Sequence, residues 1–240
     1  MRPTGSPPKG NSYHAHRDRQ RRRILDAARG LFDEQGIGQV TMTDITSASG
    51  LRVSTIYQYF SNKDEIVWAI LAEILEDLAA QAKVATEAAA TAWDKIAALF
   101  EVMAGALAQH PGKVRFLAQF DAMYSRNWPA ERLLTLEAKI NPPGFLYFGD
   151  LVREGIADGS LRPDLDPEIT LHAVINAVVG AQRRLASLGH RVEMEYGQPV
   201  DRLFRETIRI ILLGLRAVEG PKPRAIIRQR AITRKRRKNR

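Results

Sequence analysis

The chain lacks cysteine and any long run of apolar residues. The absence of cysteine excludes disulfide bridges, thiolate metal sites, iron–sulfur clusters and a cysteine nucleophile, and it fits a reducing compartment. The longest uncharged apolar stretches, such as residues 171–182, are shorter than the ~18 residues that a membrane-spanning helix needs. Residues 1–16 contain no apolar segment like that of a secretory signal. We therefore expect a soluble, cytoplasmic protein.

The sequence also lacks the motifs of common enzymes. It contains no HExxH, no P-loop, no GxSxG and no GxGxxG after a strand. The histidines are scattered, and acids such as Asp164 and Asp166 lie in a proline-rich loop, where they are typical of turn and cap residues. We expect no catalytic residue, no metal site and no cofactor, and therefore a protein that is not an enzyme.

Charge is distributed unevenly along the chain. The formal net charge is +9, but residues 1–23 carry +6, residues 221–240 carry +10 and residues 24–220 carry −7. The basic ends are either solvated tails or attractants for a polyanion, because neutralised phosphates release their counterions. RNA, DNA and an anionic membrane would all satisfy this charge, which does not choose between them.

Apolar residues recur at helical spacing along most of the chain, and no segment alternates with the two-residue period of a strand. Proline, glycine and asparagine interrupt the helical pattern at residues 110–112, 127–129, 141–144 and 158–159. The pattern predicts an all-α fold of nine or ten helices.

Residues 41–60 predict two short helices joined by a tight turn, behind a supporting helix that starts near residue 19. Thr41 is a good N-cap, and Gly50 is suited to the turn that ends the first short helix. On the second short helix, residues 52–60, we expect Val53, Ile56 and Phe60 to face inward. A helix-turn-helix and an ordinary helical hairpin both contain such a turn.

The outward side chains of residues 52–60 are better suited to a nucleic-acid groove than to water. They include hydroxyls and an amide, which hydrogen-bond to phosphates and base edges, and aromatic rings, which pack on sugars and thymine methyls. No acid lies between Thr46 and Asn62 to repel phosphate. Lys63 follows at a helix start, where backbone N–H groups add to its positive charge.

These residues resemble the N-terminal DNA-binding domain of the TetR family of transcriptional regulators. Residues 40–63 follow the family's pattern almost position by position, and the most specific matches are Thr41, Asp44, Ile45, Gly50, Ile56, Tyr57, Tyr59, Phe60 and Lys63. The resemblance implies a three-helix helix-turn-helix head and a larger helical body. It divides the chain into a flexible basic segment (1–18), a DNA-binding domain (19–67), a ligand-binding and dimerisation domain (68–219) and a basic, disordered tail (220–240).

The resemblance also implies which residues contact DNA. Thr41 and Lys63 are expected at phosphates, and basic residues of 17–23 near phosphates or in a minor groove. Arg52 and Gln58 depart from the family's usual choices and are suited to reading guanine and adenine respectively. The predicted set is Thr41, Thr43, Arg52, Ser54, Thr55, Tyr57, Gln58, Tyr59 and Lys63.

The middle of the chain is rich in aromatic residues, which are either ordinary core or the lining of a cavity for an apolar or amphipathic ligand. His172 and Asn176 share a helix face, where they are either satisfied polar groups or ligand contacts. The predicted ligand-binding set is Met103, Phe116, Gln119, Phe120, Tyr124, Trp128, Phe148, His172 and Asn176. The sequence does not identify the ligand.

Two late helices are candidates for a dimer interface. Small side chains on the first permit close approach of another helix, and the last helix carries an apolar stripe. The alternatives are packing within one chain and a four-helix seam between two copies. The predicted interface residues are Ala173, Ala177, Gly180, Ala181, Leu203, Ile211 and Leu215.

We interpret the chain as a sequence-specific transcriptional regulator, a repressor that binds a palindromic operator as a homodimer and is released by a small apolar or amphipathic ligand. Its expected partners are double-stranded DNA, a second copy and an unknown effector, without a membrane. The alternative is a non-specific nucleic-acid-binding or nucleoid-associated protein driven by the basic tails, which would leave the pattern of residues 41–63 unexplained.

Overall fold

The computed structural model describes residues 9–126, 129–140 and 148–217, which fold into eleven α-helices and confirm the all-α prediction. The helices are α1 (Lys9–Gln35), α2 (Met42–Ser49), α3 (Val53–Tyr57), α4 (Lys63–Glu87), α5 (Ala92–Gln109), α6 (Pro111–Tyr124), α7 (Ala130–Ile140), α8 (Phe148–Ala157), α9 (Thr170–Leu188), α10 (His190–Tyr196) and α11 (Val200–Leu215). Within this described part of the chain, no helix is long and apolar enough to cross a membrane.

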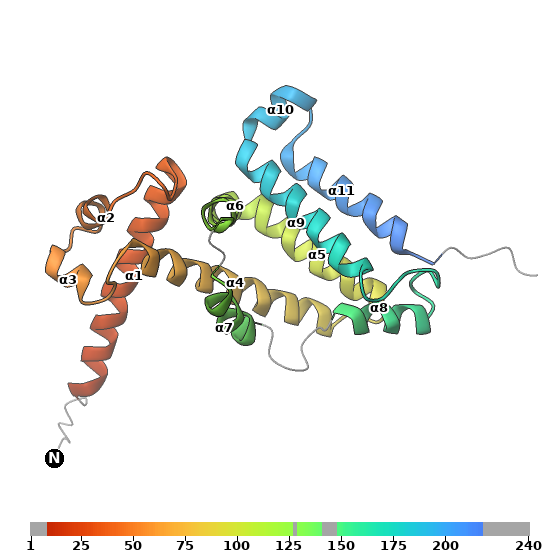
Figure 1. The fold of residues 1–240 in the computed structure, drawn as a ribbon, viewed down its shortest axis with the longest axis horizontal. Helices are drawn as coiled ribbons and strands as arrows, with labels where there is room; N and C mark the ends of the chain where they lie inside the picture. The colour runs from red at the N-terminus through yellow and green to blue at the C-terminus, as the bar shows by residue number, and fades with distance from the viewer. Residues whose placement is uncertain (1–8, 127–128, 141–147, 218–240) are drawn as a thin grey trace, which may run out of the picture.

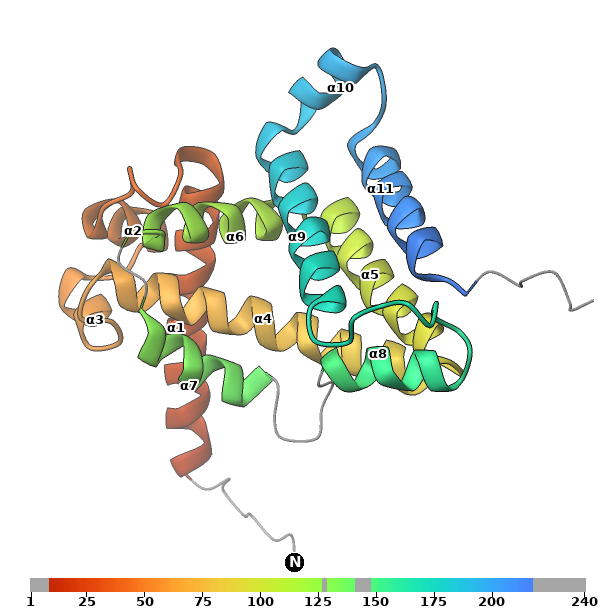
Figure 2. The same cartoon turned by 45° about the vertical axis from the view of Figure 1, so that its right-hand side comes forward.

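Helices α1, α2 and α3 form a head at one end of the molecule, and α4 leads from the head into the remaining helices (Figure 1). A view turned by 45° shows α5, α9 and α11 side by side in the body, with α10 beyond them (Figure 2). The expected domain boundary at residue 67 therefore falls inside α4, which belongs to both parts.

Two clusters of buried side chains hold the molecule together. The first joins the head to α4 and includes Ile24, Ile45, Ile56 and Ile66, which are all fully buried. The second lies in the body among α5, α8, α9 and α11. Helix α6 contributes to both clusters, since Val114 belongs to the second and Phe116, Leu117 and Phe120 to the first. The position of α6 thus couples the head to the body.

Helix α1 begins at Lys9, whereas the sequence led us to expect a flexible segment up to residue 18. Residues 9–23 carry no apolar stripe, so periodicity gave no signal for this part of the helix. Contacts with distant residues support it instead. The Arg21 guanidinium binds Glu73 at 2.6 Å and lies 5.8 Å from the Phe60 ring centroid, and Arg17 lies 6.0 Å from the ring of Tyr59.

Candidate nucleic-acid interface

Helix α2 is fixed at its start by a reciprocal pair of side-chain hydrogen bonds. The Thr41 hydroxyl accepts a hydrogen bond from the Asp44 backbone N–H at 3.2 Å, and the Asp44 carboxylate accepts one from the Thr41 N–H at 2.8 Å. These bonds satisfy donors that a helix start leaves without partners. The hydrogen bonds from Thr41 hold the pKa of Asp44 below its ordinary value, so the carboxylate stays charged at neutral pH. The exposed Thr41 side chain is thereby held in one orientation at the head surface.

The turn between α2 and α3 favours glycine at position 50. Gly50 has φ 61° in the left-handed region, which a residue without a Cβ adopts at little cost. A Cβ at this position would also displace the end of the exposed Arg23 side chain, whose guanidinium nitrogen would lie 2.8 Å away. The Gly50 N–H donates to the carbonyls of Thr46 and Ser47 at 3.2 and 3.3 Å, which closes α2 and sets the direction of α3.

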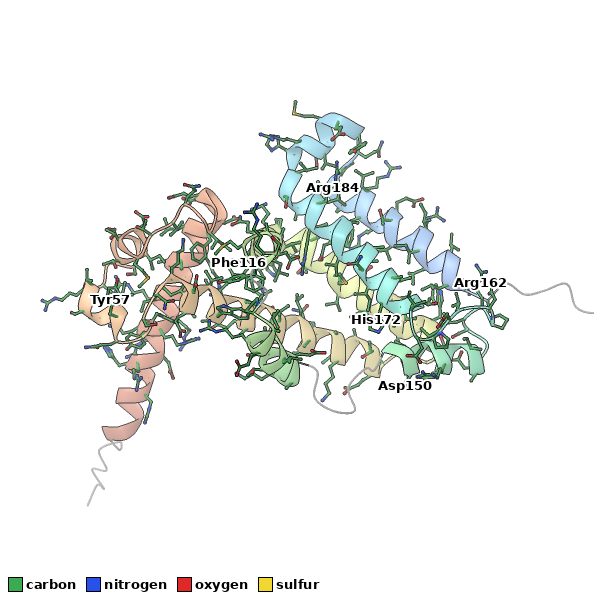
Figure 3. The ribbon with its side chains drawn as sticks, in the orientation of Figure 1. Tyr57, Phe116, Asp150, Arg162, His172 and Arg184 are labelled. Atoms are coloured by element: carbon green, nitrogen blue, oxygen red, sulfur yellow. The ribbon has the colours of Figure 1, made fainter. Side chains whose placement is uncertain are left out.

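Helix α3 presents an exposed surface at the end of the head. Ile56 is fully buried, whereas Tyr57 is 52% exposed and points away from the body (Figure 3). Of the predicted DNA contacts in this segment, Arg52, Ser54 and Gln58 are exposed and Thr55 is half-buried. The structure therefore brings these predicted residues together on one short helix and its two ends.

Val53 corrects the expectation that its side chain faces inward. It is 56% exposed, because α3 begins at this residue and buries only Ile56 in its single turn. Val53 and Tyr57 are four residues apart and share one face. An exposed apolar pair on an otherwise polar surface suits contact with thymine methyl groups. The four-residue separation of Val53 and Tyr57 indicates in the sequence that they share a face. It does not indicate that the face is exposed, because a valine in a helical pattern more often lies in the core.

Two other residues predicted to contact DNA, Tyr59 and Lys63, make contacts inside the head. Tyr59 is half-buried against the core of the head, with Arg17 over its ring. The Lys63 ammonium donates hydrogen bonds to the carbonyls of Ile37 and Val40, both at 2.8 Å. Two of its three N–H donors are therefore used inside the head, and only the third is left for a phosphate. Thr43 on α2 is exposed.

Arginines of α1 line a groove beside the end of α2. The groove has a volume of about 550 Å³ and is lined by Arg19, Arg22, Arg23, Asp26, Ala27, Ala48 and Ser49. Arg19, Arg22 and Arg23 form no ion pair with any carboxylate in the described part of the chain, whereas Arg21 and Arg29 both bind Glu73. The unpaired guanidinium groups leave positive charge next to the helix-turn-helix.

The predicted ligand-binding residues fall into separate places. Phe116, Phe120 and Tyr124 are stacked along α6; the ring of Phe120 lies 5.1 Å edge-on from Trp68, and that of Tyr124 lies 5.6 Å from Trp68. Burial, followed by the nearby charge of Asp64, raises the pKa of Tyr124. This cluster lies where α6 crosses the head and α4, with Phe116 between head and body in Figure 3.

Gln119 lies on the same helix but binds the head. Its side-chain oxygen accepts a hydrogen bond from the Ile37 N–H at 2.7 Å, and its amide nitrogen donates to the Phe32 carbonyl at 3.4 Å. Both ends of the amide are therefore used within the protein.

The remaining predicted ligand contacts do not join this cluster. Met103 is half-buried in the second core. His172 and Asn176 share a face of α9 as expected, but that face is exposed, because Leu171, Val178 and Leu185 form the buried side of the helix. Trp128 lies outside the described residues. Phe148 begins α8, and its side chain lies outside the described part as well.

A groove of about 500 Å³ lies between α4 and α7, beside the aromatic cluster. It is lined by Glu65, Trp68, Ala72, Glu131, Arg132, Thr135, Leu136 and Lys139. The Arg132 guanidinium lies 5.5 Å from the Trp68 ring centroid and binds the Glu65 carboxylate at 3.2 Å. An apolar floor with charged groups at the rim suits an amphipathic molecule. No sequence signal predicted this groove, since it depends on how α7 packs on α4.

The predicted dimer residues divide between an exposed face and the core. On α9, Ala173, Ala177 and Gly180 are exposed, and Ala181 is half-buried. On α11, Leu203 and Ile211 are half-buried. Leu215 is only 4% exposed and packs inside its own chain, so the expectation for this residue is corrected; the exposed apolar side chains of α11 are instead Ile210 and Leu213. Helix α11 ends at Leu215, and its buried stripe turns this last residue inward.

Comparison with known proteins places the head in a defined sequence family. The family profile described as bacterial regulatory proteins, tetR family, matches residues 24–70, which include α2, α3 and the start of α4. The transcriptional repressor KstR2 of Mycolicibacterium smegmatis is 23% identical over 213 residues, covering 85% of this chain and 94% of that protein. KstR2 of Mycobacterium tuberculosis is 27% identical over 150 residues, covering 62% and 73% of the two chains.

Solved structures show that the whole fold is shared. The structure of the ketosteroid transcriptional regulator KstR2 of Mycobacterium tuberculosis superposes with a TM-score of 0.62 and 23% identity, over 82% of this chain and 95% of that one. The fatty acid degradation regulator FadR of Bacillus halodurans gives a TM-score of 0.60 and 22% identity, over 83% and 97%. The helical body therefore has the same architecture as the bodies of these regulators.

Proposed function

Since this chain belongs to the TetR family of bacterial transcriptional regulators, we propose that it is a repressor that binds a palindromic operator as a homodimer and leaves it when a small apolar or amphipathic molecule binds the body. The observation that carries the proposal is the exposed surface of α3. Tyr57, Val53, Ser54 and Gln58 are presented at the end of the head by a capped α2 and a glycine turn that fix their direction.

The proposed homodimer uses the exposed face of α9 together with α11. Ala173, Ala177 and Gly180 allow a second helix to approach closely, and Ile210 and Leu213 offer apolar surface beside them. Two α3 helices about one DNA turn apart, ~34–36 Å, would then read the two halves of a palindrome.

The proposed effector site is the groove between α4 and α7. One structural relative is described as a ketosteroid transcriptional regulator and another as a fatty acid degradation regulator, which supports an apolar or amphipathic ligand for this chain. Trp68 and Leu136 offer an apolar contact, and Arg132 and Lys139 offer cations for a polar end. Helix α4 carries this site and also Ile66 of the head core, so a ligand that shifts α4 also moves the head.

Release from DNA is then a shift between two populations. The effector binds more tightly to a form of the body in which the recognition helices no longer match the operator. It lowers operator affinity by no more than its difference in affinity for the two forms.

The alternative function, non-specific binding driven by the basic ends, fits the charge of residues 1–23 and 221–240. It does not explain the pattern of residues 41–63. The match of residues 24–70 to the regulator family and the similarity to named repressors support a sequence-specific reader instead.

Footprinting on the DNA upstream of its own gene tests the proposal, at ~150 mM salt with excess random competitor DNA, because specificity is a ratio of affinities. We expect a protected palindrome. In Tyr57→Ala we expect an operator affinity at least about tenfold weaker, the size of one lost base-pair contact.

The matched control is Tyr196→Ala, a tyrosine of similar exposure on α10, which is 49% exposed compared with 52% for Tyr57. It should protect the palindrome like the wild type. Equal protection by the Tyr57 and Tyr196 variants would show that α3 does not read the operator.

A further inference from the structure

The loop between α1 and α2 is held from two sides by helices that extend beyond the head. Gly36, with φ 87°, reverses the chain at the end of α1. The N–H of the next residue, Ile37, donates to Gln119 of α6 at 2.7 Å, and its carbonyl accepts from Lys63 of α4 at 2.8 Å. Both backbone polar groups of Ile37 are therefore fixed by side chains from outside the three head helices, four residues before the N-cap of α2.

Two other contacts join α6 to the head. The Arg115 guanidinium binds both oxygens of Asp33 at 2.8 and 2.9 Å, a bidentate and therefore directional pair, which lies at the surface where solvent screens its charge. The rings of Phe32 and Phe116, 6.1 Å apart, provide apolar contact that tolerates sliding. The hydrogen bond from Ile37 to Gln119 is partly buried and ends on the backbone, so it fixes orientation as well as proximity.

The same stretch of α6 is also tied to α9. Asp121, two residues after Gln119, forms an ion pair with Arg183, which is half-buried between the two helices. Arg183 is next to Arg184, which is exposed on α9 in Figure 3, on the helix that the proposed dimer uses. A short series of contacts thus runs from the dimer helix through Asp121 and Gln119 to the start of α2.

We propose that Gln119 determines which half-site spacing the dimer accepts, by locking the rotation of each head relative to α6 through the Ile37 N–H. The inference rests on the proposed function, because it concerns a dimer bound to a palindrome. The head is joined covalently to the body only through α4. Without the Ile37–Gln119 bond, α6 holds the head through the surface Arg115–Asp33 pair and apolar contacts such as Phe32–Phe116, and the head can turn relative to α6 within these restraints. A small turn of each head changes the separation of the two α3 helices, and a freed dimer accepts several spacings.

The test uses the palindrome that the wild-type protein selects from random-sequence duplexes. Variants of this duplex have one or two base pairs inserted or removed at the centre, and the dissociation constant of each is measured. We expect the wild type to lose at least about tenfold in affinity on each altered duplex, comparable to a mismatched base pair. Gln119→Met, which keeps length and helix propensity but removes the acceptor, should lose no more than about threefold.

Two further variants separate spacing control from general damage. Gln119→Glu keeps an acceptor for the Ile37 N–H and should retain the wild-type spacing preference; relaxed spacing in this variant would overturn the proposal. Gln109→Leu, an exposed glutamine at the end of α5, should leave the preference unchanged. Helicity and the urea midpoint of each variant show whether it is folded.

The outcomes distinguish this inference from the function on which it rests. A wild type that selects a palindrome but tolerates several spacings equally would overturn the role of Gln119 without any variant, as would a Gln119→Met protein with the wild-type penalty. In both cases the operator-binding function stands. A wild type that selects no palindrome would overturn both the function and the inference.

Discussion

At the scale of single residues, the head depends on a few backbone and cap positions that leave little freedom. Thr41 and Asp44 fix the start of α2, Gly50 fixes its end, and Lys63 closes the loop that precedes it. Each acts on the backbone next to an exposed side chain of the DNA-binding surface. A change at Asp44 or Gly50 therefore alters the direction of α3 without touching a predicted DNA contact, whereas Thr41 and Lys63 are themselves predicted to contact phosphates.

Gly50→Ala is expected to destabilise the protein by about 1–3 kcal/mol, because a Cβ raises the energy of the left-handed backbone at φ 61°. Urea unfolding followed by circular dichroism measures the loss. Gly30→Ala is the matched control, since Gly30 lies inside α1 with open space around its Cβ position and should gain about 0.5–1 kcal/mol. Equal losses in both variants would show that the turn at Gly50 is not constrained as described.

At the scale of elements, α6 and α11 each have two surfaces with different surroundings. Helix α6 packs in both cores, contacts the head through Gln119 and binds α9 through Asp121, so it cannot shift without effect on either part. Helix α11 buries Phe204, Ile208 and Leu215 in its own chain and exposes Ile210 and Leu213 on the other side. The buried face packs within the chain, and the exposed face is the one proposed for the dimer.

Leu213→Asp is expected to convert the proposed homodimer into a folded monomer, because a charge on the exposed apolar face opposes burial against a second copy. Analytical ultracentrifugation measures the mass, and operator affinity should fall with the loss of the second head. Leu134→Asp is the control: Leu134 is 65% exposed, compared with 54% for Leu213, and it belongs to α7, which lies apart from α11 in Figure 1. A Leu213→Asp protein that remains dimeric would exclude this face of α11 from the interface.

At the scale of the whole molecule, charge and shape act on different parts of DNA recognition. The net charge of −7 over residues 24–220 leaves attraction to DNA to the basic ends, which include Arg19, Arg22 and Arg23. Attraction to phosphate is independent of base sequence, whereas base contacts, which we propose for the surface of α3, distinguish one sequence from another. The two contributions can therefore be measured separately.

Deletion of residues 221–240, which lie outside the described part of the structure and carry ten of the 36 Lys and Arg residues, tests the contribution of charge. We expect weaker binding to operator and to random DNA by the same factor, and a flatter dependence of affinity on salt, because fewer counterions are released. Titrations of both duplexes between 50 and 200 mM salt measure the effect. A loss confined to the operator would contradict a role independent of sequence.

Much of this protein was determined by its sequence alone. Helical periodicity, the cap at Thr41 and the glycine at position 50 are local signals, and they predicted the all-α fold and the limits of α2. The pattern of residues 40–63 also predicted the family, because a helix-turn-helix needs particular side chains at fixed separations along a short segment.

Only the tertiary structure decided which groups the other side chains contact and which of them are exposed. From the sequence we expected similar roles at a ligand for Gln119 and His172, but packing turns Gln119 toward the backbone of the head and leaves His172 exposed on α9. For the same reason Val53, which we expected to face inward, is exposed, and Leu215, which we expected at a dimer interface, is buried in its own chain. Periodicity states which residues share a helix face, whereas the partner of that face is decided by residues far away in the chain.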